Sequence, residues 1–197
     1  FLGGRMIDIA IANKLVAEFK ENTGLDASRK ATPKAYIKLL LAAEKAKKNL
    51  CGGVPSVKVN VECLMNDRDL ANVKLTREEL EEICAPLADR MMDPIEQALN
   101  EVGIQKSELK SIEATGGALR MSVFKKKVGS YFGLEPVEPN YGLMTTMDMD
   151  ESAGHGCALQ CAMISPKFNV KAFDIQHGIQ YPITISWDQP DVASTAD

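Results

Sequence analysis

The stretch Glu113-Ala114-Thr115-Gly116-Gly117-Ala118-Leu119-Arg120 predicts a strand that runs into a diglycine turn and then opens a helix. A bare Gly-Gly lets backbone amides approach a ligand closely, and the N-terminus of a following helix favours anions and polar groups. About thirty residues later, Asp148-Met149-Asp150-Glu151 predicts an acidic start to another helix. Most Gly-Gly turns only turn the chain, so the meaning of this one depends on the surrounding sequence.

Composition narrows the class of protein. The chain has 197 residues, of which 45 % are hydrophobic, and a formal net charge of −4. These values are ordinary for a globular protein of one domain or two small ones. The weakly acidic balance argues against a nucleic-acid partner. No apolar run approaches the roughly 18 residues of a membrane span, and no signal peptide is visible, so we expect no membrane partner.

The first part of the chain predicts a small α+β unit of two helices and a hairpin. An apolar residue at every fourth position, from Ile7 to Phe19, marks one helix, and Gly52-Gly53 ends the next. Strict alternation then marks a strand, which turns back at Asn66-Asp67. The expected elements are helices over 7–21 and 33–50 and strands over 57–63 and 69–75.

The remainder predicts a helix-rich unit with short strands. Thr76 and Glu79 form a capping-box pattern, after which a helix runs toward Glu101 with bends or breaks at Pro86 and Pro94. The other expected elements are a strand over 110–115, helices over 118–132 and 150–163, and strands over 170–176 and 180–187.

Several segments resemble the seventy-kilodalton heat-shock chaperones, and more narrowly their hundred-and-ten-kilodalton branch. Leu2-Gly3-Gly4-Arg5-Met6-Ile7-Asp8 resembles the opening of the second lobe of that family's nucleotide-binding domain, and Glu44-Lys45-Ala46-Lys47-Lys48 its nucleotide-contacting helix. The segments over 61–67 and 156–166 resemble the larger branch.

This resemblance implies the fold class α+β / α/β: an actin-like, ribonuclease-H-like lobe II with a small outer subdomain and an incomplete sheet. The implied divisions are an outer subdomain (1–77), a partial inner subdomain (78–165), an interdomain linker (166–172), the start of a substrate-binding β domain (173–188) and a flexible tail (189–197). Because Phe1 falls inside a family motif, we expect the chain to be a fragment of a longer one.

The resemblance assigns one wall of an adenosine site to Glu44, Lys47 and Lys48. These residues lie at i, i+3 and i+4 and therefore share a helix face. A carboxylate accepts hydrogen bonds from ribose hydroxyls, and aliphatic lysine stems cover a base. The alternative is a solvated helix face with a Glu44–Lys48 ion pair.

The opposite wall is assigned to a second group of residues: Gly116, Gly117, Ala118, Arg120 and Asp150. The diglycine backbone would approach the sugar and phosphates, the planar guanidinium would stack on the base, and Asp150 would be a polar anchor. The alternative is an exposed cation and an acid that the helix dipole favours. Leu119 and Gly154 depart from the family pattern and bear on nucleotide affinity.

The implied cofactor is ATP or ADP, with Mg²⁺ only in the intact domain. In the family, the residues that bind Mg²⁺ and the first phosphate loops precede residue 1, and the chain has no Walker-type Gly-x-x-x-x-Gly-Lys-Ser/Thr. We therefore expect no catalytic residues here and no hydrolysis by this chain alone.

Three functions stay open. The first is a nucleotide-binding chaperone fragment whose parent is a cytosolic, and possibly nuclear, nucleotide-exchange factor for a seventy-kilodalton heat-shock partner and a holdase for unfolded proteins. The second is an ordinary seventy-kilodalton chaperone ATPase. The third is a degenerate interaction module that binds no nucleotide.

The cysteines predict neither disulfides nor a metal site. No Cys-x-x-Cys occurs, and the two histidines lie at no zinc-like spacing from any cysteine. Cys157 and Cys161 are one helical turn apart, and we expect them to be small buried hydrophobic residues in a reduced cytosol.

Overall fold

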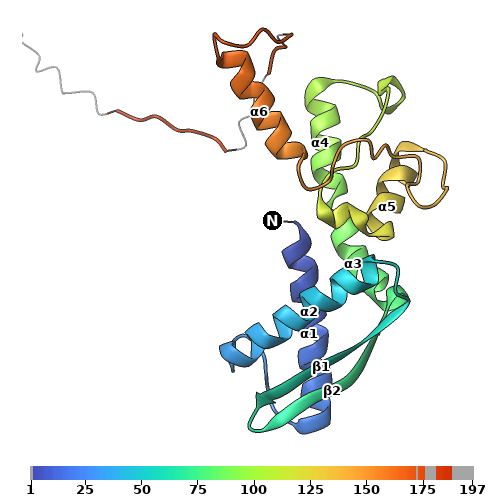
Figure 1. Cartoon of the computed structure of the whole chain (residues 1–197), viewed down its shortest axis with the longest axis vertical. Helices are drawn as coiled ribbons and strands as arrows, with labels where there is room; N and C mark the ends of the chain where they lie inside the picture. Colours follow the sequence, from blue (N-terminus) through green and yellow to red (C-terminus); the bar gives the residue numbers. More distant parts are fainter. Residues whose placement is uncertain (1, 172, 176–180, 188–197) are drawn as a thin grey trace, which may run out of the picture. The chain divides into compact units, whose positions relative to one another are not determined.

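The structure is a computed structural model that describes residues 2–171, 173–175 and 181–187. It divides into two units, Phe1–Gly154 and His155–Asp197, which are described separately. Figure 1 labels the helices and strands along the chain. Helices and strands are both present, and the one sheet formed by the described residues has two strands.

Two long helices, α1 (Gly4–Thr23) and α2 (Pro33–Cys51), pack against each other and cross in Figure 1. The expected apolar face of α1 is confirmed, since Ile7, Ile11, Leu15 and Phe19 are all buried. The helix ends at Gly24, whose φ of 73° is the left-handed conformation that glycine adopts without strain. The core of this region is therefore built from residues whose spacing already predicted a helix.

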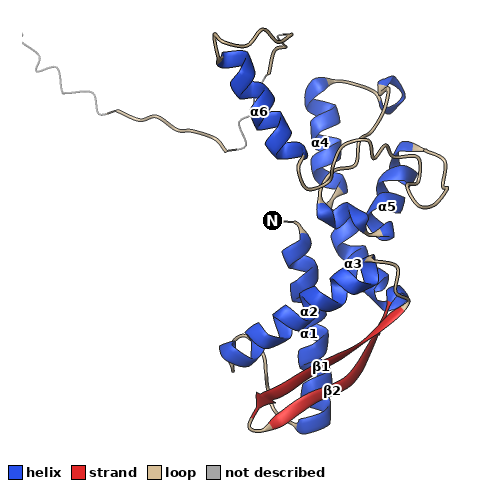
Figure 2. Ribbon diagram, in the orientation of Figure 1, coloured by secondary structure: helices blue, strands red, loops and turns tan. Residues whose placement is uncertain are grey.

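The antiparallel hairpin of β1 (Ser56–Met65) and β2 (Arg68–Thr76) packs against these helices, and its two strands stand out in Figure 2. Its register shifts between Val59 and Val61 and again between Val61 and Met65. Cys63, with φ of 46°, lies in the second irregularity and is exposed, whereas Leu64 is buried. The predicted alternation therefore changes phase at Cys63, because an extra residue in a strand moves the following side chains to the other face.

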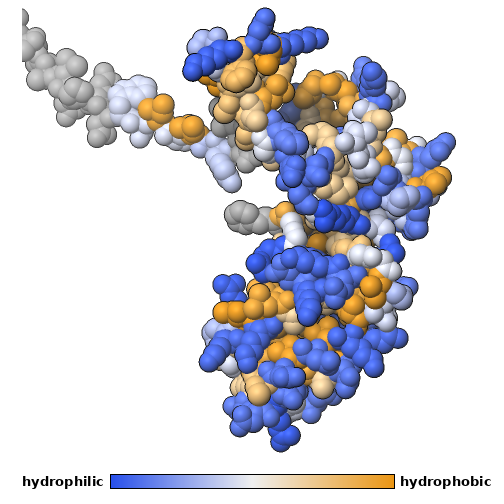
Figure 3. Space-filling model, in the orientation of Figure 1, coloured by the Kyte–Doolittle hydropathy of each residue, from blue (hydrophilic) through white to orange (hydrophobic). Residues whose placement is uncertain are grey.

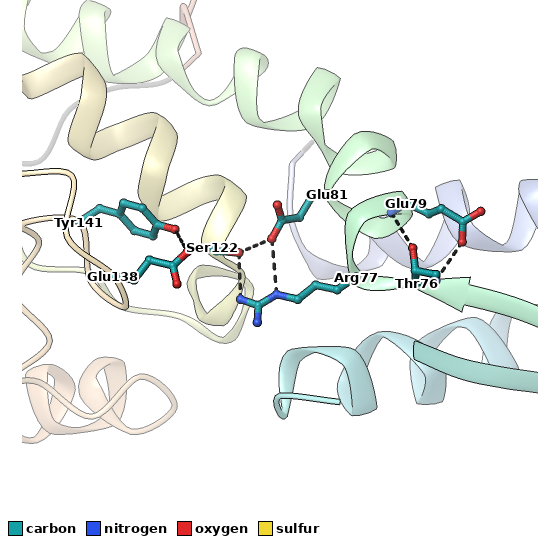
Figure 4. A network of polar contacts seen from close by, with 7 residues as sticks. All are labelled: Thr76, Arg77, Glu79, Glu81, Ser122, Glu138 and Tyr141. Carbon is teal, nitrogen blue, oxygen red and sulfur yellow. Dashed lines mark hydrogen bonds and ion pairs between the residues drawn. The ribbon is translucent and has the colours of Figure 1, made fainter. Parts of the chain in front are cut away.

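The capping box predicted for the next helix is confirmed. In α3 (Arg77–Arg90) the Thr76 side chain accepts from the N–H of Glu79, and the Glu79 carboxylate accepts from the N–H of Thr76 (Figure 4). The long helix expected as far as Glu101 is divided at Met91 into α3 and α4 (Met92–Val102).

The two prolines of this region have different positions in the helices. Pro86 lies inside α3, whereas Pro94 falls in the first turn of α4. A first-turn N–H has no partner within its helix, so a proline there costs no hydrogen bond.

Two expectations around the diglycine stretch are wrong in detail. The expected strand over 110–115 is reduced to one isolated parallel bridge between Glu113 and Met144, because no described strand pairs with the rest of it. The expected helix over 118–132 is divided at Met121. The diglycine stretch itself ends in the 3₁₀ turn η2 (Gly117–Arg120). The 3₁₀ turn η1 (Lys106–Glu108) precedes this stretch, and the helix α5 (Ser122–Phe132) follows it.

The last helix, α6 (Ser152–Ile164), ends before Ser165-Pro166 as expected. None of its residues is buried, and Cys157 and Cys161 are exposed, so the expectation of buried thiols is wrong for this helix. The expected strands over 170–176 and 180–187 are absent from the described parts, which are 170–171, 173–175 and 181–187. The rest of those segments and the expected tail lie outside the described residues.

Two groups of buried apolar residues hold the first unit together. The larger joins α1, α2, the hairpin and α3 to Met121 and Phe124, and the smaller gathers Met92, Ala114, Val128 and Leu143. Figure 3 shows mainly hydrophilic residues on the visible face over α1, α2 and the hairpin, with hydrophobic patches between them. No helix in the described part of the chain is long and apolar enough to cross a membrane.

Candidate functional site

A cleft of about 600 Å³ opens in the first unit between α2, the start of α1 and η2. This volume falls within the roughly 300–1,000 Å³ of small-molecule sites. Its lining residues are Gly4, Ile7, Lys47, Lys48, Cys51, Gly52, Gly117, Ala118, Arg120, Met121 and Asp150.

The cleft brings together six of the eight residues proposed from sequence: Lys47, Lys48, Gly117, Ala118, Arg120 and Asp150. The other two, Glu44 and Gly116, do not line it. Glu44 instead forms an ion pair with Lys48. Gly116 has a φ of 95° and donates its N–H to the carbonyl of Met149 at 3.1 Å. It therefore helps to form the diglycine turn without lining the cleft. The cleft therefore joins two lysines of α2 to residues that follow them by more than sixty positions in the sequence.

Lys47 is fixed to the first turns of α1. Its Nζ lies 2.6 Å from Oδ1 of Asp8 and donates to the carbonyl of Gly4 at 3.1 Å. The two side chains of the pair are only 15 % and 4 % exposed, respectively, so solvent screens their attraction weakly. Arg5 approaches the other carboxylate oxygen of Asp8 at 3.7 Å. This anchoring sets where the lysine stem lies in the cleft.

Lys48 and Glu44 form a second pair on α2, 2.8 Å apart and one helical turn from each other. The hydrogen bond from Lys48 lowers the pKa of the Glu44 carboxyl, and the same bond raises the pKa of Lys48. Both groups are therefore charged at neutral pH. The alternative predicted from sequence, a Glu44–Lys48 ion pair on a helix face, is present together with the cleft.

The side of the cleft opposite α2 is formed by two segments, η2 and the turn over 148–151, and hydrogen bonds hold both in place. Arg120 donates from Nη2 to Oδ2 of Asp150, which ties η2 to the 148–151 turn. In that turn, Oδ1 of Asp148 accepts from the N–H groups of Asp150 at 2.8 Å and Glu151 at 2.7 Å. The acidic pair of the sequence motif is thus divided, with Asp148 closing a turn and Asp150 lining the cleft.

A polar network connects α3 to the start of α5, next to this wall (Figure 4). Arg77 donates from Nη2 to Oγ of Ser122 at 3.2 Å, and Ser122 donates to Glu81. Nε of Arg77 also lies 3.5 Å from Glu81. Arg77, Glu81 and Ser122 line a cavity of about 20 Å³ that shares lining residues with the cleft, including Arg120. The network therefore holds the start of α5 against α3 beside the cleft.

Sequence reasoning missed several cleft residues. These are Gly4, Ile7, Cys51, Gly52 and Met121 in the lining, and Asp8 behind it. Asp8 follows Ile7 in the predicted helix, but helix spacing alone does not show that its carboxylate is buried. In the part of the chain that the structure describes, no group of three or more His, Cys, Asp or Glu side chains is placed to hold a metal ion.

Comparison with known families identifies the family of the chain. The model of the family described as Hsp70 protein matches residues 1–195. The chain belongs to the Hsp70 family. The resemblance seen in the sequence to the seventy-kilodalton heat-shock chaperones is therefore confirmed.

Three Hsp70-family relatives illustrate the match. Heat shock 70 kDa protein 4 of Homo sapiens is 33 % identical over 196 residues, which is 100 % of this chain and 22 % of the relative. Heat shock 70 kDa protein 4L of Homo sapiens is 33 % identical over 95 % of this chain and 21 % of the relative. Heat shock 70 kDa protein 14 of Arabidopsis thaliana is 36 % identical over 94 % of this chain and 21 % of the relative. The Hsp70 chain described here spans about one fifth of the length of these relatives.

Proposed function

We propose that this chain forms the adenosine-binding wall of an Hsp70-type nucleotide-binding domain, as the second lobe of an actin-like fold. One observation carries the proposal: Lys47 and Lys48 of α2 share a cleft of about 600 Å³ with Gly117, Arg120 and Asp150. These are residues that the resemblance to the family assigned to two walls of one adenosine site. Membership of the Hsp70 family supports ATP or ADP as the ligand.

The chemistry of the lining suits a nucleoside. Ile7, Cys51, Ala118 and Met121 give apolar surface for a purine ring. The pair with Asp150 holds the Arg120 guanidinium by its edge, and its planar face remains suited to stacking. The cleft thus offers apolar contact together with a few fixed polar groups, the usual composition of small-ligand sites.

For the longer protein, we propose a hundred-and-ten-kilodalton type of chaperone that promotes nucleotide exchange on a seventy-kilodalton heat-shock partner and holds unfolded clients. The similarity to heat shock 70 kDa proteins 4 and 4L supports this assignment. Exchange would operate by differential affinity, because a protein that binds the open state of its partner better shifts the partner toward opening. Accelerated release of labelled ADP from the partner by the longer protein would support this role, and an unchanged release rate would reject it.

Titration calorimetry of the 197-residue chain with ADP tests the proposed ligand directly. Arg120→Ala should weaken binding about tenfold or more, because it removes a large contact surface and leaves Asp150 unpaired. Arg29→Ala is the matched control, since Arg29 is exposed and does not line the cleft. A folded chain that gives no heat with ADP, and no shift in melting temperature, would reject the proposal in favour of a module that binds no nucleotide.

A further inference from the structure

A second hollow lies on the side of α2 that faces away from the cleft. It has a volume of about 210 Å³ and lies between α2 and β1, which pack against each other (Figure 2). Its lining residues are Ala42, Lys45, Ala46, Asn49, Val57, Lys58, Val59 and Asn60. Because an α-helix turns by about 100° per residue, the α2 residues of this set project away from Lys47, Lys48 and Cys51 of the cleft. This hollow, called the α2–β1 groove below, is therefore separate from the proposed nucleotide site.

The α2–β1 groove runs along the edge of β1. Successive side chains of a strand point to opposite faces, so a hollow on one face would be lined by every second residue. Residues 57–60 instead line the groove without a gap. In the part of the chain that the structure describes, the sheet consists of β1 and β2 alone. The other edge of β1 therefore has no strand beside it, and such an edge can pair with an added strand.

Two lysines of the groove have no carboxylate partner. Lys45 and Lys58 are both exposed, and neither forms an ion pair with a described residue. By contrast, Lys47 and Lys48 on the cleft side of α2 are both paired. Because complementary charge steers partners together, two uncompensated cations favour a partner that carries carboxylates.

The floor of the groove is apolar and has small side chains. Val59 and Ala46 are buried, and Val57 and Ala42 are half-buried. The valines therefore lie on the core side of β1, whereas the exposed Lys58 between them lies on the solvent side. The volume of the groove is below the roughly 300–1,000 Å³ of small-molecule sites. It suits a stretch of extended chain better than a whole small ligand.

We propose that the α2–β1 groove binds an extended acidic segment of a partner protein, which adds to the edge of β1 as a third strand. Apolar residues of the segment would continue the row of Val57 and Val59, and the carboxylates between them would continue the row of Lys58. This surface goes beyond the proposed nucleotide function, since it lies on the other side of α2. The alternative is that the lysines only protect a bare edge from aggregation, as lysines on edge strands do.

Fluorescence anisotropy of the 197-residue chain with three labelled heptapeptides tests the proposal. The first alternates glutamate and valine, and the second alternates lysine and valine. The third has the sequence of the first, with an N-methyl group on every internal peptide nitrogen. The first should bind about tenfold or more tightly than the second, because its charge complements the two lysines. It should exceed the third by a similar factor, because N-methylation removes the backbone donors of a strand.

Lys58→Gln and Lys74→Gln form a matched pair of variants. The two lysines are partners in the hairpin register, so either change removes one cation from the same cross-strand pair. Lys74 does not line the groove and would lie two strand spacings, about 10 Å, from the added strand. Lys58→Gln should weaken binding of the first peptide about threefold to fivefold, as expected for one exposed ion pair. Lys74→Gln should weaken it less than about twofold, because salt screens charges at that distance.

Lys45→Gln should weaken binding about as much as Lys58→Gln, because it removes the other unpaired cation. Amide hydrogen exchange then locates the peptide: exchange should slow over residues 57–60 and stay unchanged over α5. Equal losses for Lys58→Gln and Lys74→Gln would show a general charge effect and overturn the proposal. A folded chain that binds none of the peptides, or binds the N-methylated one as tightly as the first, would also overturn it. Neither result would bear on ADP binding at the cleft.

Discussion

The carboxylate of Glu113 accepts the backbone N–H of Met147 at 2.7 Å, and so joins the segment before the diglycine to the segment before Asp150. Its other oxygen accepts from the hydroxyl of Thr146 at 3.1 Å. The same two segments are joined by the N–H of Ala114, which donates to the carbonyl of Met144 at 2.8 Å. The two halves of the sequence motif are therefore connected by hydrogen bonds within the protein.

Glu113→Ala should loosen this connection. Removing the carboxylate leaves the N–H of Met147 without its acceptor and should lower the free energy of unfolding by about 1 kcal/mol, the usual net value of a hydrogen bond. Urea unfolding measures this loss. Glu108→Ala, which removes an exposed carboxylate from η1, is a control that should not change the ADP affinity. If Glu113→Ala binds ADP with the same dissociation constant as the wild type, ADP binding does not depend on the hydrogen bond between Glu113 and Met147.

Thr76→Ala should remove the side-chain acceptor of the α3 capping box. The expected loss of stability is about 1 kcal/mol, because the N–H of Glu79 then loses its partner at the helix start. Thr76→Ser retains the hydroxyl and should restore most of the stability. Equal unfolding midpoints for Thr76→Ala and Thr76→Ser would contradict the assignment of the cap.

The elements with a local cause could be predicted from sequence. The apolar period of α1 and the capping box of α3 each depend on neighbouring residues only, and both are confirmed. The change of phase at Cys63 could not be predicted, because a bulge is set by the register of two strands and has no clear local signature. The expected strand before the diglycine failed for a related reason: a strand requires a partner along its length, and partners are not encoded locally.

The candidate site also combines features that local sequence predicts with features that depend on distant parts of the chain. The face of α2 that bears Lys47 and Lys48 followed from helix spacing, whereas its position opposite Gly117 did not follow from any local pattern. Asp8 was missed because a carboxylate in an amphipathic helix is usually solvated, and only the packing of α1 on α2 buries this one.

Stability should depend on pH through Glu79. The hydrogen bond from Lys14, followed by the bond from the Thr76 N–H, lowers the pKa of this carboxyl in the folded state. A group with a lowered folded pKa contributes stability above its unfolded pKa, near 4.3, and loses it as the pH falls through the folded value. Unfolding free energies at pH 7 and at about pH 3 should therefore differ more in the wild type than in Glu79→Gln. Identical pH dependence of the unfolding free energy in the two proteins would show that Glu79 does not contribute to it.

Gly129→Ala should be destabilising because α5 packs closely on the chain at Tyr141. A Cβ at Gly129 would lie 2.5 Å from the carbonyl oxygen of Tyr141, a contact that requires the backbone to move. We expect a loss of about 1–3 kcal/mol in unfolding free energy, as for other overpacked sites. Gly154→Ala is the matched control, since nothing lies within 4 Å of its added Cβ and alanine favours a helix. A Gly129→Ala chain as stable as the wild type would show that the two segments can separate at little cost.

The thiols should react with iodoacetamide in an order set by their surroundings. Burial raises the pKa of Cys84 to about 12, and burial also raises the pKa of the half-buried Cys51. Because the thiolate is the reactive form, both should react more slowly at pH 8 than the exposed Cys63. Cys51 lines the cleft, so saturating adenosine should slow its alkylation further while leaving that of Cys63 unchanged. Peptide mass spectrometry follows each site separately, and an adenosine-independent rate at Cys51, in a chain that binds adenosine by calorimetry, would place the ligand outside this cleft.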